Sequence, residues 1–403
     1  MKVTLEDIKK AAENIKPYIH QTLLEHSASL SDLVGADVYL KFENLQQTGS
    51  FKIRGAANKV SSLTQQEKSV GVIAASAGNH AQGVALVAQK LGVKATIVMP
   101  EMSPLIKVAS TKRFGAEVIL KGSAYDDAYQ TALELQKKHG SIFIHPFEDE
   151  KIIAGQGTIG LEIINACPEV DVVYIAIGGG GLLSGIAIAL KALNSKIKII
   201  GVQASGADSM ARSFKSKKLV TNIQKVSTIA DGIAVKQPSD VMYSQFISKL
   251  CDDVVTVNDD EIAKTIVLLM ERAKTVVEGA GAVSVAALLS KKSNIKFKKA
   301  VAVLGGGNID LNTLEKVIDR GLQEAGRLAR ILVSAPDVPG SLNRLTSIIA
   351  EKKANVLQIN HNRVSDRIHL RETLIEFTLE TTGPAHIVEI KKSFEAIGAT
   401  ILE

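Results

Sequence analysis

Short apolar segments that alternate with segments of helical length constrain the fold of this 403-residue chain more than any other feature. Apolar runs at 70–75, 95–99 and 171–177 each precede a stretch with helical spacing of its apolar residues. Short strands that are apolar throughout are typical of a parallel sheet covered by helices on both faces. The pattern therefore predicts an α/β protein whose ligands bind beyond the carboxyl ends of the strands.

The strand–helix units fall into two groups, one within about 42–150 and another between about 156 and 304. In the first group Ser103–Pro104 predicts a helix capped by Ser103, and 141–145 is expected to be a strand. The second group follows a helix expected at about 156–166, and the chain from the first helix to about Ser27 is expected to be a loop. A chain of this length exceeds what a single hydrophobic core usually supports. We therefore expect two parallel-sheet subdomains, the smaller at about 42–150, and a ligand site in the cleft between them.

The pattern changes after Ala329, where the segments alternate as strand, helix, strand, strand, helix and strand. These segments lie at 331–333, 340–353, 356–364, 373–379, 387–397 and 400–402. The βαββαβ order is that of a ferredoxin-like unit. The sequence therefore predicts a first domain at 1–325 and a second at 329–403.

The composition is that of a soluble globular protein, with 46% apolar and 22% charged residues. Its net charge of +6 is spread along the chain without tryptophan or a basic tract, so we expect no nucleic-acid partner. The N-terminus leads into a helix capped by Thr4, and no segment has the length of a membrane span. Cys167 and Cys251 lack the spacing of a zinc or disulfide site, which favours a cytoplasmic protein without a metal.

Lys52 is the candidate for covalent chemistry. It stands between Phe51 and Ile53, after the polar turn Gly49–Ser50 and before a helix-forming stretch. At such a helix start the amine is partly desolvated, and an amine that loses its proton near neutral pH can condense with an aldehyde. The alternative is a surface lysine whose stem covers apolar neighbours, which is the commoner situation for a lysine.

A run of glycines lies between an apolar strand and a helix. It consists of Gly178, Gly179, Gly180 and Gly181, followed by Leu182. Backbone N–H groups at such a turn, aided by the helix dipole, suit a phosphate; the alternative is a close strand–helix crossing. The run does not complete the G-x-G-x-x-G motif of dinucleotide-binding proteins. In its two possible frames, Leu183 or Ser184 occupies the position of the third glycine.

A second strand-to-helix turn suits another anion, such as the carboxylate of an amino acid. It consists of Ser76, Ala77, Gly78, Asn79 and His80. The alternative is that Ser76 or Asn79 merely caps the helix.

Four motifs in order carry a resemblance to the pyridoxal-phosphate enzymes of fold type II. They are Ser50–Ala56, Ser76–His80, Gly178–Leu182 and Gly305–Asn308. More narrowly, the chain resembles the threonine dehydratases that carry a C-terminal ACT domain, and the resemblance covers nearly the whole chain. It implies two parallel-sheet subdomains, an ACT domain and pyridoxal 5′-phosphate bound to Lys52.

The resemblance also implies roles for individual residues. Asn79 would bond the 3′-oxygen of the cofactor, Phe51 would pack on its ring, and the substrate carboxylate would lie at Ser76–His80. The residues expected around the cofactor are Lys52, Phe51, Asn79, Gly178, Gly179, Gly180, Gly181, Leu182, Gly232, Glu278 and Gly305.

The implied reaction is the deamination of L-threonine to 2-oxobutanoate and ammonia, and of L-serine to pyruvate. Alternatives are a serine dehydratase or racemase of the same fold, a β-replacing synthase and a non-enzymatic amino-acid sensor. Racemases have a serine where this chain has Ala77, and their metal ligands fall on Gln203 and Ser209. Gly305 stands where many relatives place serine or cysteine beside the pyridine nitrogen, which favours fast β-elimination over reprotonation.

The turn between the first strand and helix of the second domain is similar to the amino-acid-binding turn of ACT domains. It consists of Asp337, Val338, Pro339, Gly340 and Ser341. The resemblance implies an amino-acid effector, isoleucine or valine first, and a homo-oligomer, either dimer or tetramer. A plain dimerisation module is the alternative.

Overall fold

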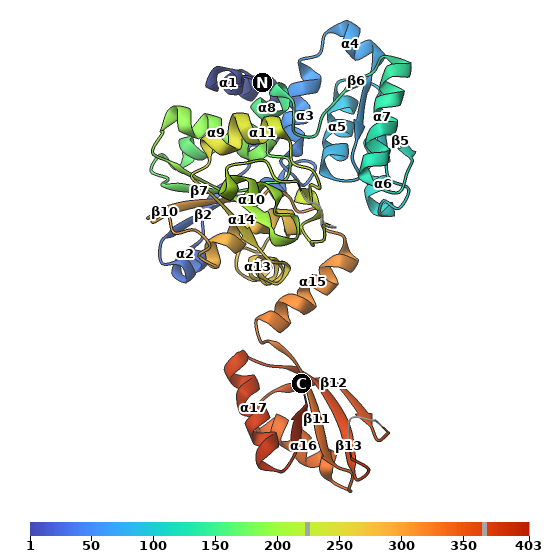
Figure 1. The fold of residues 1–403 in the computed structure, drawn as a ribbon, viewed down its shortest axis with the longest axis vertical. Coiled ribbons are helices and arrows are strands. Elements are labelled where there is room, and N and C mark those ends of the chain that lie inside the picture. The colour runs from blue at the N-terminus through green and yellow to red at the C-terminus, as the bar shows by residue number, and fades with distance from the viewer. Residues whose placement is uncertain (222–225, 365–368, 403) are drawn as a thin grey trace. The chain divides into compact units, whose positions relative to one another are not determined.

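A computed structural model describes residues 1–221, 226–364 and 369–402 (Figure 1). The chain divides into two compact units, Met1–Leu311 and Asn312–Glu403, which are described separately below. The domain limits that we expect from the sequence, 1–325 and 329–403, remain a prediction. No helix among the described residues is both long enough and apolar enough to cross a membrane.

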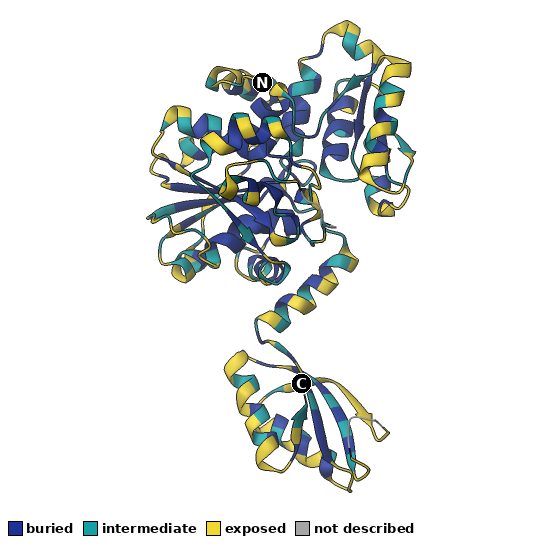
Figure 2. Ribbon diagram, viewed as in Figure 1, coloured by how far each residue is buried: buried dark blue, intermediate teal, exposed yellow. Residues whose placement is uncertain are grey.

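The first unit contains a six-stranded sheet in the order β1-β2-β10-β7-β8-β9, parallel except for the edge strand β1. Its strands are β1 (Leu24–His26), β2 (Asp37–Lys41), β7 (Val172–Ala176), β8 (Lys198–Ala204), β9 (Asp253–Val257) and β10 (Lys299–Val303). Its helices include α1 (Leu5–Ile15), α2 (Ala28–Val34), α8 (Glu150–Ala166), α9 (Gly181–Leu193), α10 (Ser209–Ser216), α13 (Asp259–Arg272) and α14 (Gly279–Leu289). Figure 2 shows that buried residues concentrate along these strands and the helices that cover them.

A second sheet of the same unit has four parallel strands in the order β5-β4-β3-β6. The strands are β3 (Val72–Ala75), β4 (Ala95–Met99), β5 (Glu117–Leu120) and β6 (Ile142–Phe143). Nearby helices are α3 (Lys52–Ser61), α4 (Gln65–Val70), α5 (Asn79–Lys90), α6 (Leu105–Arg113) and α7 (Tyr125–His139). Alternate residues of β3 join different cores, one shared with α3 and α5 and the other with α7. The predicted pair of parallel sheets is therefore confirmed.

Helix α8 packs closely against both α3 and α9. A Cβ atom on Gly155 would lie 2.6 Å from the Arg54 carbonyl oxygen, and one on Gly185 would lie 2.3 Å from the Ile153 carbonyl oxygen. Such distances are below any van der Waals contact, so the helices approach this closely only because glycine has no side chain. Helix α3 is thereby fixed beside the first residues of α8.

The second unit has the predicted βαββαβ order. After α15 (Leu311–Glu324), which begins at the boundary, it contains β11 (Leu328–Pro336), α16 (Ser341–Glu351), β12 (Asn355–Asn362), β13 (Glu372–Glu380), α17 (Pro384–Ala396) and β14 (Thr400–Leu402). The sheet is antiparallel in the order β12-β13-β11-β14. Val333, Phe377 and Phe394 are fully buried in its core, which confirms the ferredoxin-like prediction.

Two local expectations for the chain before Lys52 and for α6 are wrong. The segment to Ser27, expected as a loop, contains β1, which is too short to show a pattern and forms only because β2 offers it an edge. Ser103 does not cap α6: the helix begins at Leu105, and the Ser103 hydroxyl donates to the Pro100 carbonyl oxygen instead.

Two further boundaries also differ. Helix α8, expected from Gln156, begins at Glu150, because the Asp149 carboxylate caps it by accepting from the N–H groups of Lys151 and Ile152. The strand expected at 141–145 is reduced to the two residues of β6, since its ladder with β3 ends there.

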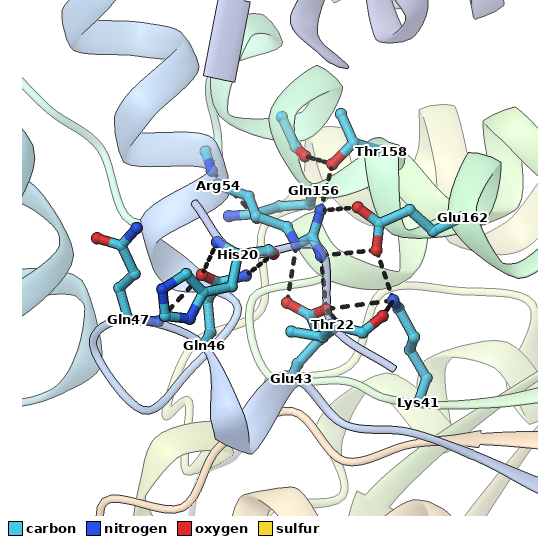
Figure 3. Close-up of polar contacts among 12 residues, drawn as sticks. His20, Thr22, Lys41, Glu43, Gln46, Gln47, Arg54, Gln156, Thr158 and Glu162 are labelled. Atoms are coloured by element: carbon cyan, nitrogen blue, oxygen red, sulfur yellow. Dashed lines mark hydrogen bonds and ion pairs between the residues drawn. The ribbon is translucent and has the colours of Figure 1, made fainter. Parts of the chain in front are cut away.

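A buried ionic network anchors helix α3 (Figure 3). The Arg54 guanidinium donates to both carboxylate oxygens of Glu43, at 2.8 Å each, and to both of Glu162, at 2.6 and 2.8 Å. Lys41 Nζ also donates to Glu162, and Thr22 donates to Glu43. Burial works to raise the pKa of Glu43, but the charges of Arg54 and Lys41 outweigh it and hold this pKa below its ordinary value. Two cations thus balance two carboxylates, and the network joins α3 to β2 and α8.

We predict that Arg54→Ala strongly destabilises α3, because it leaves the fully buried Glu43 carboxylate without its main partner. The loss expected for breaking such a pair is about 3–5 kcal/mol. Amide hydrogen exchange of α3 in the whole protein measures it. Lys299→Ala, which removes the ion pair with Glu169 at the surface, is the control and should leave α3 protection unchanged. Equal protection in both variants would contradict the prediction.

Candidate active site

The Lys52 amine lies at the start of α3, as expected. The turn before it contains Gly49, whose φ of +71° is a left-handed conformation that glycine adopts without strain. Lys52 Nζ donates to the Pro146 carbonyl oxygen at 2.9 Å and lies 5.3 Å from the centre of the Phe51 ring. The amine is therefore held between its own turn and the loop that follows β6.

The surroundings of this amine favour its neutral form. Burial lowers the pKa of Lys52 to about 8, against the opposing effect of the Glu278 carboxylate. Burial, and then the positive charge of Lys52, lower the pKa of His80 to about 3 and that of His145 to about 4. Both imidazoles are therefore neutral at pH 7. An amine with this pKa is unprotonated often enough near neutrality to act as a nucleophile or a base.

The Lys52 turn is bonded to the loop that follows β10. The Phe51 N–H donates to the Gly305 carbonyl oxygen at 3.1 Å, and the Gly307 N–H donates to the Gly49 carbonyl oxygen at 2.9 Å. A Cβ atom on Gly305 would touch the Phe51 ring at 3.5 Å. Gly305 therefore lies beside Phe51, and the expectation that both border the ring of a cofactor stays a prediction.

The glycine-rich turn lies between β7 and α9, and Gly180 has a φ of +94°. A Cβ atom on Gly179 would lie 2.2 Å from the Phe147 ring, and one on Gly178 would lie 3.0 Å from the Ile233 Cα atom. The first N–H groups of α9 have no acceptor within the helix, and the Ser184 N–H is the first to bond back, to Gly180. The turn therefore presents N–H groups that suit a phosphate.

The Ser76–His80 turn lies between β3 and α5. Neither Ser76 nor Asn79 caps the helix, because Gly78 is the N-cap and no side chain caps it. The Ser76 hydroxyl accepts from the Gly78 N–H at 3.2 Å, and His80 Nε2 donates to the Ile144 carbonyl oxygen at 2.8 Å. The His80 ring thus supports the fold, whereas the backbone amides at the start of α5 are placed to bind an anion.

Asn79 and Glu278 meet directly, although they are far apart in the sequence. Asn79 Nδ2 donates to Glu278 Oε1 at 2.7 Å. Burial, and then the nearby Asp231 carboxylate, raise the pKa of Glu278 to about 7. A Cβ atom on Gly232 would lie 3.4 Å from Glu278 Oε1, so the segment around Gly232 also borders this carboxyl group.

These contacts form a closed ring that includes the Lys52 amine. Lys52 contacts Pro146, Phe147 borders the glycine turn, Gly178 borders Ile233, and Gly232 borders Glu278. Glu278 contacts Asn79, which is bonded through Asn308 to the Thr48 carbonyl oxygen of the Lys52 turn. An amine, a phosphate-sized turn of N–H groups and an amide are thus gathered at the carboxyl ends of strands from both sheets. These donors fit an aldehyde that carries a phosphate.

Sequence reasoning missed three of these residues. Pro146 and Phe147 follow a two-residue strand and carry no motif, so nothing in the sequence distinguishes them. Asn308 belongs to the Gly305–Asn308 motif, which is the signal that could have identified it.

One hollow of the first unit lies away from the Lys52 amine. It has a volume of about 340 Å³ and is bordered by the amino ends of β3 and β4 and by α7, at the opposite end of the small sheet from the Ser76–His80 turn. A ligand site in the cleft between the two sheets remains a prediction. Among the described residues, no group of three or more His, Cys, Asp or Glu side chains is arranged to hold a metal ion.

The turn at Asp337–Ser341 lies between β11 and α16 of the second unit. Gly340 is the N-cap of α16 with a φ of +88°, and the Ser341 N–H donates to the Val338 carbonyl oxygen. Asp337 forms an ion pair with Arg363 at 3.3 Å. The turn therefore places a helix N-terminus beside charged side chains.

Comparison with known proteins gives the following similarities. The family of pyridoxal-phosphate dependent enzymes matches residues 15–306, and the ACT domain family matches residues 329–398. The L-threonine ammonia-lyase of Thermotoga maritima is 48% identical over 396 residues, which cover 98% of each chain. Threonine deaminase isoform 2 of Solanum lycopersicum, in its processed form, has a TM-score of 0.73 at 38% identity, covering 79% of this chain and 90% of that one. Maize serine racemase has a TM-score of 0.75 at 35% identity, covering 80% and 99%.

We predict that Gly179→Ala weakens pyridoxal-phosphate binding, because the new methyl group would overlap the Phe147 ring. Overpacking of this kind typically costs about 1–3 kcal/mol. Titration of the cofactor-free protein with pyridoxal phosphate, followed by visible absorption, measures the change. The double variant Gly179→Ala/Phe147→Leu should recover part of the affinity. An unchanged affinity in Gly179→Ala would contradict the assignment of this turn.

Proposed function

The chain belongs to the family of pyridoxal-phosphate dependent enzymes, and we propose that within it the protein is a threonine ammonia-lyase. The proposed reaction converts L-threonine to 2-oxobutanoate and ammonia. The single observation that best supports it is the ring of contacts that includes the Lys52 amine, whose pKa of about 8 suits an amine that must form a covalent bond and carry a proton. The similarity to the Thermotoga maritima L-threonine ammonia-lyase over 98% of the chain supports the substrate.

When bound, pyridoxal phosphate supplies an aldehyde that holds an amino group and an electron-withdrawing ring that acidifies Cα. We assign Lys52 to the attachment of the cofactor and to the removal of the Cα proton. The N–H groups at the start of α9 would hold the phosphate, Phe51 and Gly305 would border the ring, and Asn79 would donate a hydrogen bond to the 3′-oxygen of the cofactor. The neutral His80 and His145 add no charge that would compete for the phosphate.

We assign the substrate carboxylate to the backbone amides at the start of α5. Its helix N-terminus offers N–H groups without intrahelical partners, which favour an anion. L-Serine differs from L-threonine by one methyl group, which is worth only about 1–3 kcal/mol of discrimination. The proposed enzyme therefore also converts L-serine to pyruvate, at a lower or comparable rate.

Racemisation is the less favoured reaction, although maize serine racemase is a structural relative. Ala77 stands where the family resemblance places the acid–base serine of racemases, and a methyl group cannot carry a proton. Gln203, at one of the metal-ligand positions implied by that resemblance, already accepts the Ala211 N–H at 2.8 Å through Oε1.

We further propose that an amino acid binds at the turn Asp337–Ser341 and regulates the enzyme, and that the protein is a homo-oligomer. The match of residues 329–398 to the ACT domain family supports this assignment. Cys167 and Cys251 are both free thiols, which agrees with the reducing cytoplasm as the proposed location.

The whole protein loaded with pyridoxal phosphate should form 2-oxobutanoate from L-threonine and pyruvate from L-serine, in a keto-acid assay. Lys52→Ala should abolish both reactions, because Lys52 is the residue assigned to cofactor attachment and to removal of the Cα proton. Lys59→Ala is the matched control: Lys59 lies on the same helix but pairs with Asp149, so this variant should stay active. Turnover by Lys52→Ala like that of the unmodified protein would refute the assignment.

The regulatory proposal predicts that isoleucine or valine binds the whole protein with measurable heat and changes its activity. Gly340→Ala should weaken this binding, because alanine at a φ of +88° strains the turn by about 1–2 kcal/mol. Gly398→Ala is a matched control, since Gly398 has a φ of +80° and equally open surroundings but lies after α17. Calorimetry with no heat from either amino acid and no change in activity would contradict the proposal.

A further inference from the structure

Asn308 has no role in the reaction proposed above, yet it lies at the junction of three parts of the site. It ends the Gly305–Asn308 motif, which follows β10. The neighbouring glycines make room for it and its partners. A Cβ atom on Gly49 would lie 2.3 Å from Asn308 Oδ1, and one on Gly306 would lie 2.4 Å from Glu278 Oε1. The loop is therefore shaped around a set of polar side chains.

Both hydrogens of the Asn308 amide nitrogen are used. Asn308 Nδ2 donates to the Thr48 carbonyl oxygen at 2.7 Å and to Asn79 Oδ1 at 2.7 Å. The backbone N–H of Asn308 donates to the Glu278 carboxyl group. One residue therefore connects the Lys52 turn, the start of α5 and the N-cap of α14.

These bonds determine which way the Asn79 amide faces. An amide side chain has an acceptor oxygen and a donor nitrogen of almost the same shape, so its partners fix its orientation. Because Asn308 donates, the oxygen of Asn79 must face Asn308, and its Nδ2 atom faces Glu278 at 2.7 Å. The second hydrogen of Asn79 Nδ2 is then left to donate elsewhere in the site.

We propose that Asn308 is a positioning residue, which holds the Asn79 amide with its donor toward the cofactor and ties the Lys52 turn to Glu278. This inference rests on the proposed function, because it assigns Asn79 to the cofactor. Without Asn308, the Asn79 oxygen loses its donor and the amide is free to rotate about its last side-chain bond. The cofactor would then lose the hydrogen bond from Asn79. In the unmodified protein, Asn308 orients this donor before the cofactor binds.

The test compares cofactor binding and the visible absorption of bound pyridoxal phosphate in the whole protein. Asn308→Ala removes the side-chain bonds, and Asn308→Asp keeps the shape but turns both donors into acceptors. The dissociation constant for pyridoxal phosphate should rise about tenfold to a hundredfold in each, as for loss of a buried hydrogen-bond partner. The visible band should also shift, because the hydrogen bond from Asn79 to the 3′-oxygen of the cofactor is lost.

Asn44→Ala is the matched control for a merely structural loss. Asn44 is buried, and like that of Asn308 its Nδ2 atom makes two bonds, to Thr275 Oγ1 at 2.6 Å and to the Val276 carbonyl oxygen at 3.0 Å. Asn44 makes no hydrogen bond to Asn79, so the visible band of pyridoxal phosphate bound to Asn44→Ala should not shift. In an Asn79→Ala background, Asn308→Ala should cause no further shift, because its effect passes through Asn79.

Each outcome separates the two proposals. A band that shifts in Asn308→Ala, but not in Asn44→Ala and not further in the double variant, supports the positioning role. A coloured, active protein whose band is the same in Asn308→Ala, or shifts equally in the Asn79→Ala background, overturns this inference alone. An unmodified protein that binds no pyridoxal phosphate overturns the proposed function and this inference together. If Asn308→Ala does not fold, Asn308→Ser is judged by the same criteria.

Discussion

Partial burial of the Lys52 side chain is the constraint on which the rest of the site depends. A charged amine is costly to bury, and the first unit offsets this by giving the amine a carbonyl acceptor and by lowering its pKa to about 8. Helix α3 positions the amine. Arg54 holds this helix against β2 and α8 by donating hydrogen bonds to the carboxylates of Glu43 and Glu162. The reactive group and its anchor are therefore two residues apart on the same helix.

Parallel topology explains how distant segments meet around that amine. The loops after β3, β7 and β10 all leave the carboxyl ends of their strands, where ligands bind in sheets of this kind. Two helices, α5 and α9, begin there and present unpaired N–H groups, one set for each proposed anion. Glycines at 178, 179 and 306 allow these loops to approach within distances that a Cβ atom would prevent. The site is therefore formed by loops that pack together at the carboxyl ends of strands from two sheets.

Much of this could be predicted from the sequence, because the information is local. The alternation of apolar strands and helices, the glycine run after β7 and the lysine after a polar turn each depend on neighbouring residues, and the family resemblance supplied their roles. Pairings across long separations had no such signal: Arg54 with Glu162, Lys52 with Pro146, and Asn308 with Asn79 appear only in the fold. The failed cap at Ser103 is instead a local error, since the Pro100 carbonyl group, three residues earlier, accepts its hydroxyl hydrogen.

The most direct test of the central claim is chemical and needs no substrate. The whole protein is incubated with pyridoxal phosphate, reduced with borohydride, digested and mapped by mass spectrometry. The account predicts one predominant modified peptide, carrying the reduced cofactor on Lys52. Modification that is absent, or that falls mainly on another lysine such as Lys59, would contradict it.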